Sequence, residues 1–493
     1  MHRNAKPSSR DNFDVVRILA AGGETFCVQI GIRALKASRT LRLVAPDKVA
    51  EMPCESFVLM HDCEQPYLLP GDEFGPLAAG ATGAFWLRLT VPRGTAPMTY
   101  SQELRVRSED TEKNIMLQIT VLPFDLPELQ EPVYVLYTEG IGEALLTDDS
   151  AVSSRSEIIY RDMAAHGMNT ACPTPAFRYT EGPKGLPEVA VFNLGLDFTA
   201  RLGMNHPLGF FFVGNPLYVN KRKWTAPSVY FRDYLYSKRV QRLAYALAQR
   251  RERQAALFLI DEPGLHDTSQ DGPFRNRLAT LLYAKAHEVP GIFTAMTGSD
   301  QDFNAPGPYI DLWVFGNPAR ISQVERAMNM GASVTNYGGM CSAAGSGVAY
   351  RNKFGVYSWR SGEWGQTIWT YPLKMCAQAS SGGVWPFTDW ECIRAGVDDL
   401  KYLRLLETIA QQNPTVKSMA VQLFRALNGA LHPERDHPLW THVDPQKIRA
   451  AVINILLAGL QPALTNSNSA RKDGALPDGE IHPGAPANFL KSE

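Results

Sequence analysis

The chain has no hydrophobic run that approaches the roughly 18 apolar residues needed to cross a membrane. Its first residues are polar, and the short apolar stretch at 15–21 lacks a cleavage motif. No signal peptide is therefore predicted, and a cytoplasmic location is the default expectation, with removal of a leader and export left open. Lysine and arginine form no basic stripe and the formal net charge is −1, which argues against a nucleic-acid partner.

The residue spacings that bind metals or build disulfide frameworks are also missing. The seven cysteines are scattered without a CxxC pair, and the ten histidines form no HxH or HExxH pattern. We therefore predict no metal site, no cofactor and no disulfide scaffold. The oligomeric state has no signal in the sequence.

What the chain does have is the composition of a globular protein with more than one core, since 493 residues with 45% hydrophobic content exceed a single domain. Residues 11–128 contain short alternating runs that are separated by turn residues and lack a helical period. This pattern predicts an antiparallel β-sandwich. Pro123, Pro127 and Pro132 mark a stiff linker after it.

Residues 129–410 are predicted to form a (β/α)8 TIM barrel, because eight strand-like runs alternate there with helical segments. The runs lie at 133–137, 169–172, 209–213, 256–260, 292–296, 312–315, 333–337 and 366–371. A doubly wound sheet is the alternative, but no Gly-rich phosphate fingerprint follows the first run. Residues 411–460 are predicted to form a C-terminal helical extension. Residues 461–493, rich in Pro, Gly, Asn, Ser and Ala, are predicted to be a disordered tail.

The fourth run leads directly into Asp261 and Glu262, which are followed by Pro263 and Gly264. Barrels build their active sites at the carboxyl ends of their strands. Adjacent like charges repel and burial penalises both, so paired acids at such a position point to a function. A carboxylic acid beside a carboxylate suits general acid–base cleavage of a glycosidic bond. The alternative is an acid that caps the next helix, with Pro263 as a loop residue.

A retaining glycosidase of the usual type needs a second carboxylate about 5 Å away as its nucleophile. The seventh run offers no acid at its end, and the more distant candidates are Glu139, Glu363, Asp389 and Glu391. A substrate with a 2-acetamido group removes this need, because its own carbonyl oxygen can attack the anomeric carbon. One acid then protonates the leaving oxygen while its neighbour holds the acetamido N–H.

The run Arg-Ala-Gly-Val-Asp-Asp-Leu-Lys-Tyr-Leu lies at 394–403. It is the most diagnostic of several motifs that resemble those of glycoside hydrolase family 123, the β-N-acetylgalactosaminidases and their uncharacterised relatives, and it is similar to the family's closing run. The resemblance extends over residues 18–405. Its other motifs are Leu-Ala-Ala-Gly-Gly-Glu-Thr at 19–25, Phe-Trp-Leu at 85–87 with Thr99-Tyr100, Val-Leu-Pro-Phe-Asp-Leu-Pro at 121–127 and His-Gly-Met-Asn at 166–169. Met98-Thr99 departs from the pattern, which usually has Gly there.

The resemblance implies a retaining, substrate-assisted mechanism through an oxazolinium intermediate, on a β-linked N-acetylhexosamine that is expected to be N-acetylgalactosamine. Glu262 would be the general acid/base, and Asp261 would orient the acetamido group. Tyr337 would hydrogen-bond the acetamido oxygen. The implied partner is a glycan or glycoconjugate substrate. Aromatic candidates for the walls of the sugar site, for which core packing is an equal explanation, are Trp369, Tyr371, Trp313 and Trp359.

Two other functions stay open on the sequence. One is a glycosidase for a sugar without an acetamido group, with a second carboxylate from another strand. The other is a catalytically silent carbohydrate-binding protein. We interpret Arg394, Asp398 and Asp399 as structural, either as an i,i+4 pair or as a cap of the barrel floor, and His166 as a helix-terminating residue.

Overall fold

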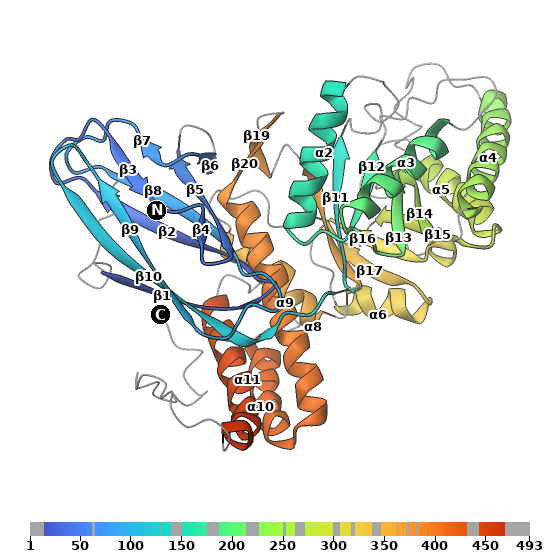
Figure 1. Ribbon diagram of the computed structural model, residues 1–493. Helices are drawn as coiled ribbons and strands as arrows, with labels where there is room; N and C mark the ends of the chain where they lie inside the picture. Colours follow the sequence, from blue (N-terminus) through green and yellow to red (C-terminus); the bar gives the residue numbers. More distant parts are fainter. Residues whose placement is uncertain are drawn as a thin grey trace.

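The computed structural model describes residues 14–61, 65–129, 131–139, 150–174, 187–212, 226–249, 253–261, 272–298, 306–316, 321–337, 347–361, 363–371, 375–380, 383–430 and 443–468. Figure 1 shows a sheet-rich N-terminal part (blue), a parallel sheet surrounded by helices (green to yellow) and a group of C-terminal helices (orange to red). The fold is therefore multidomain, as the sequence predicts.

The N-terminal part consists of two five-stranded sheets around one core. The first sheet has the order β1-β10-β9-β3-β7, and the second has the order β2-β8-β5-β4 with β6 paired to β5. Alternate residues such as Leu117 and Ile119 of the first sheet meet Leu87 and Leu89 of the second, and all four are fully buried. The strands are β1 (Val15–Gly22), β2 (Thr25–Arg33), β3 (Leu41–Val44), β4 (Lys48–Val49), β5 (Met52–Met60), β6 (Tyr67–Pro70), β7 (Glu73–Phe74), β8 (Thr82–Thr90), β9 (Thr99–Arg107) and β10 (Glu112–Asp125). One pairing departs from the antiparallel expectation, because β1 runs parallel to β10.

The second part is a TIM-like domain whose eight-stranded sheet has the order β12-β11-β18-β17-β16-β15-β14-β13. The seven ladders along this order are all parallel. The strands are β11 (Val133–Glu139), β12 (Thr170–Thr174), β13 (Leu208–Phe212), β14 (Gln254–Asp261), β15 (Ile292–Gly298), β16 (Leu312–Phe315), β17 (Ser333–Asn336) and β18 (Gly365–Tyr371). Each predicted run therefore falls on a strand.

Helical segments connect these strands: α2 (Ser150–Ala165), α3 (Pro187–Arg201), α4 (Ala226–Ala248), α5 (Gly272–His287), η3 (Gly307–Tyr309), α6 (Ile321–Asn329), α7 (Gly347–Asn352), η4 (Lys353–Tyr357) and α8 (Ser358–Arg360). The sheet is buried on both faces, which is why its strands read as continuous apolar runs. Val135, Phe210 and Phe258 belong to the inner core cluster. Leu257 and Trp313 belong to the cluster between the strands and the helices.

Side chains join the two strands that end this sheet order, β12 and β13. Within the described residues no ladder connects them, but the Thr170 hydroxyl donates to the Leu208 carbonyl at 2.6 Å. Arg253, immediately before β14, is buried and donates to the carbonyls of His206 at 2.9 Å and Leu196 at 3.2 Å. The guanidinium thus satisfies carbonyl oxygens at the amino end of the domain.

The C-terminal part consists of α9 (Thr388–Gln412), α10 (Pro414–Ala430) and α11 (Pro445–Asn468), whose apolar faces share one core cluster. The predicted boundary at 410/411 falls near the end of α9. The predicted disordered tail is wrong for 461–468, which continue α11. Residues 469–493 lie outside the described residues. None of the helices that the structure describes combines the length and apolar character of a membrane span.

A hairpin that the sequence did not predict, β19 (Cys376–Ser380) with β20 (Gly383–Pro386), follows the last barrel strand. It stands between the N-terminal sheets and α2 (Figure 1). Tyr67 of β6 stacks on Trp385 with 6.0 Å between ring centroids. The strands of the hairpin are short, and Cys376–Ser380 consists of small and polar residues, a composition typical of a loop, so no strand was predicted there.

We predict that Arg253→Met lowers the free energy of unfolding by about 2–4 kcal/mol, because two buried carbonyl oxygens lose a charged donor. Urea unfolding at pH 7 measures the effect. Arg201→Met is the control: Arg201 is an exposed arginine at the end of α3 that lies over the Phe198 ring, and it should cost less than about 1 kcal/mol. Equal effects of the two substitutions would contradict the role of Arg253.

Candidate functional site

The carboxyl ends of the strands of the TIM-like domain carry the candidate catalytic position. Asp261 is the last residue of β14 and lies in register with Thr297 of β15, whose side chain is buried. Glu262 follows it in the chain and lies outside the described residues, and only the backbone of Asp261 is described. The structure therefore places residue 261 at the strand end where barrels keep their chemistry.

Tyr337 lies at the same edge, immediately after β17. It is half-buried and packs against the inner core cluster, and its amide donates to the Phe315 carbonyl at 2.9 Å. Its hydroxyl lies beside Gly316, where a Cβ would come within 3.3 Å of the oxygen. Glycine at the end of β16 thus leaves room for a phenol that reaches across two strand ends.

β18 ends at the same edge with Trp369 and Tyr371 among its last three residues, of which only the backbone is described. Tyr371 is in register with Thr138 of β11, after an irregularity in the ladder. Glu139, the last residue of β11, is in register with Thr174 of β12. The ends of β14, β17 and β18 therefore bring positions 261, 337, 369 and 371 to one edge of the sheet, with position 139 beside them.

The other two predicted aromatic residues lie elsewhere. Trp313 is fully buried in the cluster between the strands and the helices, stacked on Phe315 with 6.1 Å between centroids. Trp359 lies on α8, packs on Phe424 at 4.8 Å and donates to Glu407 at 2.8 Å. The prediction that these two residues line the sugar site is therefore corrected. Trp313 faces the helices from β16, and Trp359 precedes β18 and lies at the amino end of that strand. Neither position faces the strand ends.

Three of the four acids considered as a distant second carboxylate, Glu363, Asp389 and Glu391, lie away from this edge. Glu363 precedes β18, whose first residue pairs with the first residue of β11, so it lies at the amino end of the strands. Its buried carboxylate accepts from Gln366 at 2.9 Å, from Asn336 at 2.5 Å and from Tyr357. Burial raises the pKa of Glu363, although these donors oppose the shift.

Asp389 and Glu391 lie in the first turn of α9. Glu391 joins that helix to both other parts of the molecule, since it accepts from Arg88 of β8 at 3.0 Å and contacts His166 after α2 at 3.5 Å. Arg394 also donates to it. Burial alone would raise the pKa of Glu391, but Arg394, His166 and Arg88 together hold it below its usual range. Of the four distant acids, only Glu139 has its position at the carboxyl ends of the strands.

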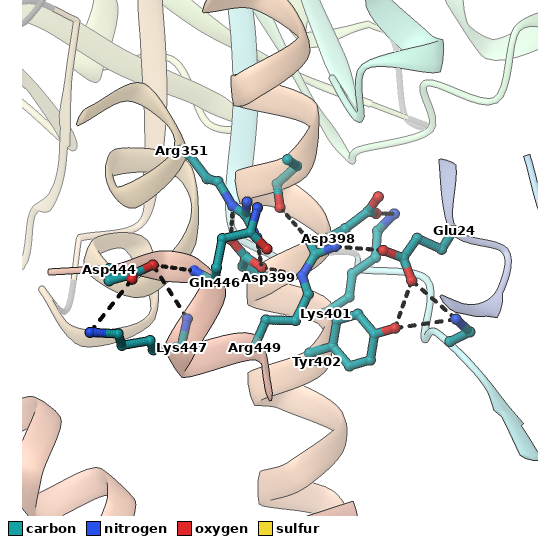
Figure 2. Close-up of polar contacts among 12 residues, drawn as sticks. Glu24, Arg351, Asp398, Asp399, Lys401, Tyr402, Asp444, Gln446, Lys447 and Arg449 are labelled. Carbon is teal, nitrogen blue, oxygen red and sulfur yellow. Dashed lines mark hydrogen bonds and ion pairs between the residues drawn. The ribbon is translucent and has the colours of Figure 1, made fainter. Parts of the chain in front are cut away.

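Figure 2 shows a second buried ionic cluster on the same helix, built around Asp399. Arg351 of α7 donates to both carboxylate oxygens of Asp399, at 2.6 and 3.0 Å, and Arg449 of α11 donates to one of them at 2.5 Å. Arg449 also reaches Glu24, in the turn between β1 and β2, at 2.5 Å. Tyr402 donates to Glu24 at 2.6 Å.

These contacts confirm the structural interpretation of Arg394, Asp398 and Asp399 but correct the pairing. Arg394 pairs with Glu391 and Asp398 pairs with Lys401, each three residues away, instead of with one another. His166 terminates α2 as predicted, because its ring contacts the carbonyl of Asp162 at 2.7 Å. Among the residues that the structure describes, no three His, Cys, Asp or Glu side chains are grouped so as to hold a metal ion.

We predict that Glu24→Ala costs about 3–5 kcal/mol of stability, because the largely buried Arg449 loses one of its carboxylate partners and the buried Ala21 amide and Tyr402 hydroxyl lose their acceptor. Urea unfolding is again the measurement. Arg42→Ala removes half of an exposed ion pair with Asp72 in the same domain and should cost less than about 1 kcal/mol. A Glu24→Ala protein as stable as Arg42→Ala would show that the buried cluster contributes little.

The comparisons with known proteins give a fold but no sequence match. No protein-family model matches the chain, and no curated protein does. Among solved structures, a family 123 glycoside hydrolase from Clostridium perfringens, described for glycolipid glycan hydrolysis, matches with a TM-score of 0.63 over 93% of this chain and 96% of that one, at 9% identity. The resemblance to family 123 that the motifs indicated is thus confirmed in the fold, over nearly the whole chain.

Other matches are glycoside hydrolases that cover only part of this chain. A GH5_18 structure from Bifidobacterium longum subsp. infantis covers 55% of it and 79% of that chain, with a TM-score of 0.40 at 12% identity. An endo-β-1,4-mannanase from Thermotoga petrophila covers 56% of it and 77% of that chain, with a TM-score of 0.37 at 12% identity.

Proposed function

We propose that this protein is a glycoside hydrolase that cleaves a β-linked N-acetylhexosamine, expected to be N-acetylgalactosamine, with retention of configuration. The observation that carries the proposal is the position of Asp261: it ends a parallel strand of a TIM-like domain that shares its fold with a family 123 glycoside hydrolase. The N-terminal sheets act as a β-sandwich that supports a (β/α)8 barrel, and the natural substrate is a glycan or glycoconjugate.

The mechanism uses the substrate's own acetamido group as nucleophile. Its carbonyl oxygen attacks the anomeric carbon and forms an oxazolinium ring while the glycosidic C–O bond breaks. Glu262 donates a proton to the leaving oxygen, and the Asp261 carboxylate accepts the acetamido N–H, which gains positive character as the ring closes. Glu262, now a carboxylate, then takes a proton from a water that attacks the anomeric carbon on the face that the leaving group occupied. This attack breaks the bond between the anomeric carbon and the oxygen of the oxazolinium ring, so that the acetamido group and the acid are both restored.

Tyr337 supports this mechanism as a donor at the same edge. Its ring packs on the inner cluster and its hydroxyl lies over Gly316. A phenol held in this way can donate to the acetamido oxygen and align it for attack on the anomeric carbon. Trp369 and Tyr371 remain the proposed aromatic wall of the sugar site. Among the four distant acids named above, Glu139 is the candidate for the second carboxylate of the non-assisted alternative, because its position shares this edge.

The first test compares wild type, Glu262→Gln and Asp261→Asn on aryl N-acetyl-β-galactosaminides and aryl β-galactosides of graded leaving-group pKa. We expect turnover of the acetamido sugars only, because the assisted route needs the acetamido oxygen. The deficit of Glu262→Gln should grow with leaving-group pKa to at least about 10³-fold, because poor leaving groups depend most on general acid catalysis. Asp261→Asn should lose activity on all of them.

Glu288→Gln, which changes an exposed carboxylate beyond α5, is the matched control and should keep full activity. Turnover of the plain galactoside by wild type would contradict the role of Asp261 and favour a second carboxylate. A folded protein that binds these sugars without hydrolysing them would instead be a carbohydrate-binding protein.

We predict that Tyr337→Phe lowers kcat on the acetamido substrate by about 10²-fold, the usual effect of losing one donor to a developing charge. Steady-state kinetics measure it. Tyr309→Phe is the control, because Tyr309 lies on η3, before the amino end of β16, where its ring packs on His287. Equal kcat values for the two variants would show that the Tyr337 hydroxyl has no role in the reaction.

A further inference from the structure

The strand that ends in Asp261 contains a β-bulge. Phe258 of β14 pairs with Ala295 of β15, and the next pair in the ladder is Asp261 with Thr297. Three residue steps on β14 therefore match two on β15, so β14 holds one extra residue. Bulges occur preferentially beside active sites, where they redirect the residues that follow.

The packing around the bulge shows what the extra residue does to the strand. Before it, Ala256 and Phe258 face the inner cluster, while Ala255 and Leu257 face the helices. Leu259 and Ile260 then both pack in the cluster on the helix side, so the alternation is interrupted there. In an uninterrupted strand, position 261 would share the helix-facing phase of 257 and 259. With the bulge it takes the phase of Ala295 and Thr297.

A tyrosine on the following helix holds the bulge in place. Tyr283 of α5 is fully buried, and its hydroxyl accepts the amides of Leu259 at 3.1 Å and Ile260 at 3.3 Å. The same hydroxyl donates to the Ala295 carbonyl at 2.8 Å. Because a bulge interrupts the ladder, its backbone groups need other partners in a dry core, and one phenol supplies them on both strands.

We propose that Tyr283 is a positioning residue for the reaction: its hydroxyl fixes the bulge that turns position 261 from the helix-facing phase to the inner face of the barrel. The inference rests on the proposed function, since it assigns Tyr283 a role through Asp261. The carboxylate must meet the acetamido N–H in a narrow range of geometry, and a small shift of the strand end lowers the rate steeply. Tyr283 itself touches no substrate.

The test removes the hydroxyl with Tyr283→Phe and keeps the ring. The matched control is Tyr134→Phe, because Tyr134 is equally buried and its hydroxyl donates to the Phe354 carbonyl at 2.7 Å on the helix-facing side of β11. We expect similar losses in melting temperature for both variants. Only Tyr283→Phe should lose kcat on the aryl N-acetyl-β-galactosaminide, by more than about 10-fold, with KM changed less than about 3-fold.

A kcat of Tyr283→Phe equal to that of Tyr134→Phe, in an active wild-type background, would overturn the inference and leave the proposed function intact. A wild-type protein that is inactive on every aryl glycoside would instead contradict the proposed function. The role of Tyr283 in catalysis would then be contradicted as well.

Hydrogen exchange tests the structural claim without an activity measurement, first in wild type and then in Tyr283→Phe. In wild type the amides of Leu259 and Ile260 should be among the slowest to exchange in β14, because a buried phenol accepts both. Exchange as fast as at a frayed strand end would overturn the claim. In Tyr283→Phe the same two amides should exchange faster, while those of Leu257 and Phe258 keep their protection.

Discussion

Two arginines and two carboxylates, clustered around Asp399 of α9, fix how the parts of this molecule sit against one another. Asp399 receives Arg351 from α7 and Arg449 from α11, and Arg449 reaches on to Glu24 in the N-terminal sheets (Figure 2). A buried charge without a partner costs several kcal/mol. Each charge in the cluster is paired only when all four side chains are in place. This requirement narrows the arrangements of the N-terminal sheets, the TIM-like domain and the C-terminal helices that have low energy. Glu391, in the first turn of α9, links the helix in the same way to Arg88 of the N-terminal sheets and to His166 after α2.

The need of buried polar groups for partners also shapes the candidate site. Residue 261 follows a bulge, and a bulge in a dry core needs partners for its backbone groups. Tyr283 provides them from α5, the helix that follows the Asp261-Glu262 segment in the chain. β14 and α5 thus form one unit: Tyr283, on the helix-facing side of the strand, determines which residue position of β14 faces inward at the end of the strand. Gly316 contributes in the opposite way, by leaving space for the Tyr337 hydroxyl.

The sequence predicted the barrel strands well because each is an apolar run bounded by turn residues, a signal that is local. It did not predict the phase of those strands. Trp313 and Phe258 lie in equally apolar runs, yet one faces the helices and the other the barrel interior, and a strand buried on both sides has no polar residues to tell these faces apart. The partners Glu24 and Arg449 are 425 residues apart, so no local pattern could join them. The role of Tyr283 depends on a register shift that only three-dimensional pairing reveals.

The N-terminal sheets contact the rest of the molecule through a hairpin and through α9. The β19–β20 hairpin begins just after the end of β18 and packs on β6, where Trp385 stacks on Tyr67. The hairpin thus stands beside the N-terminal sheets (Figure 1). Separating the N-terminal sheets from the rest of the molecule would expose Glu391 and Arg394 of α9 as well as this aromatic pair.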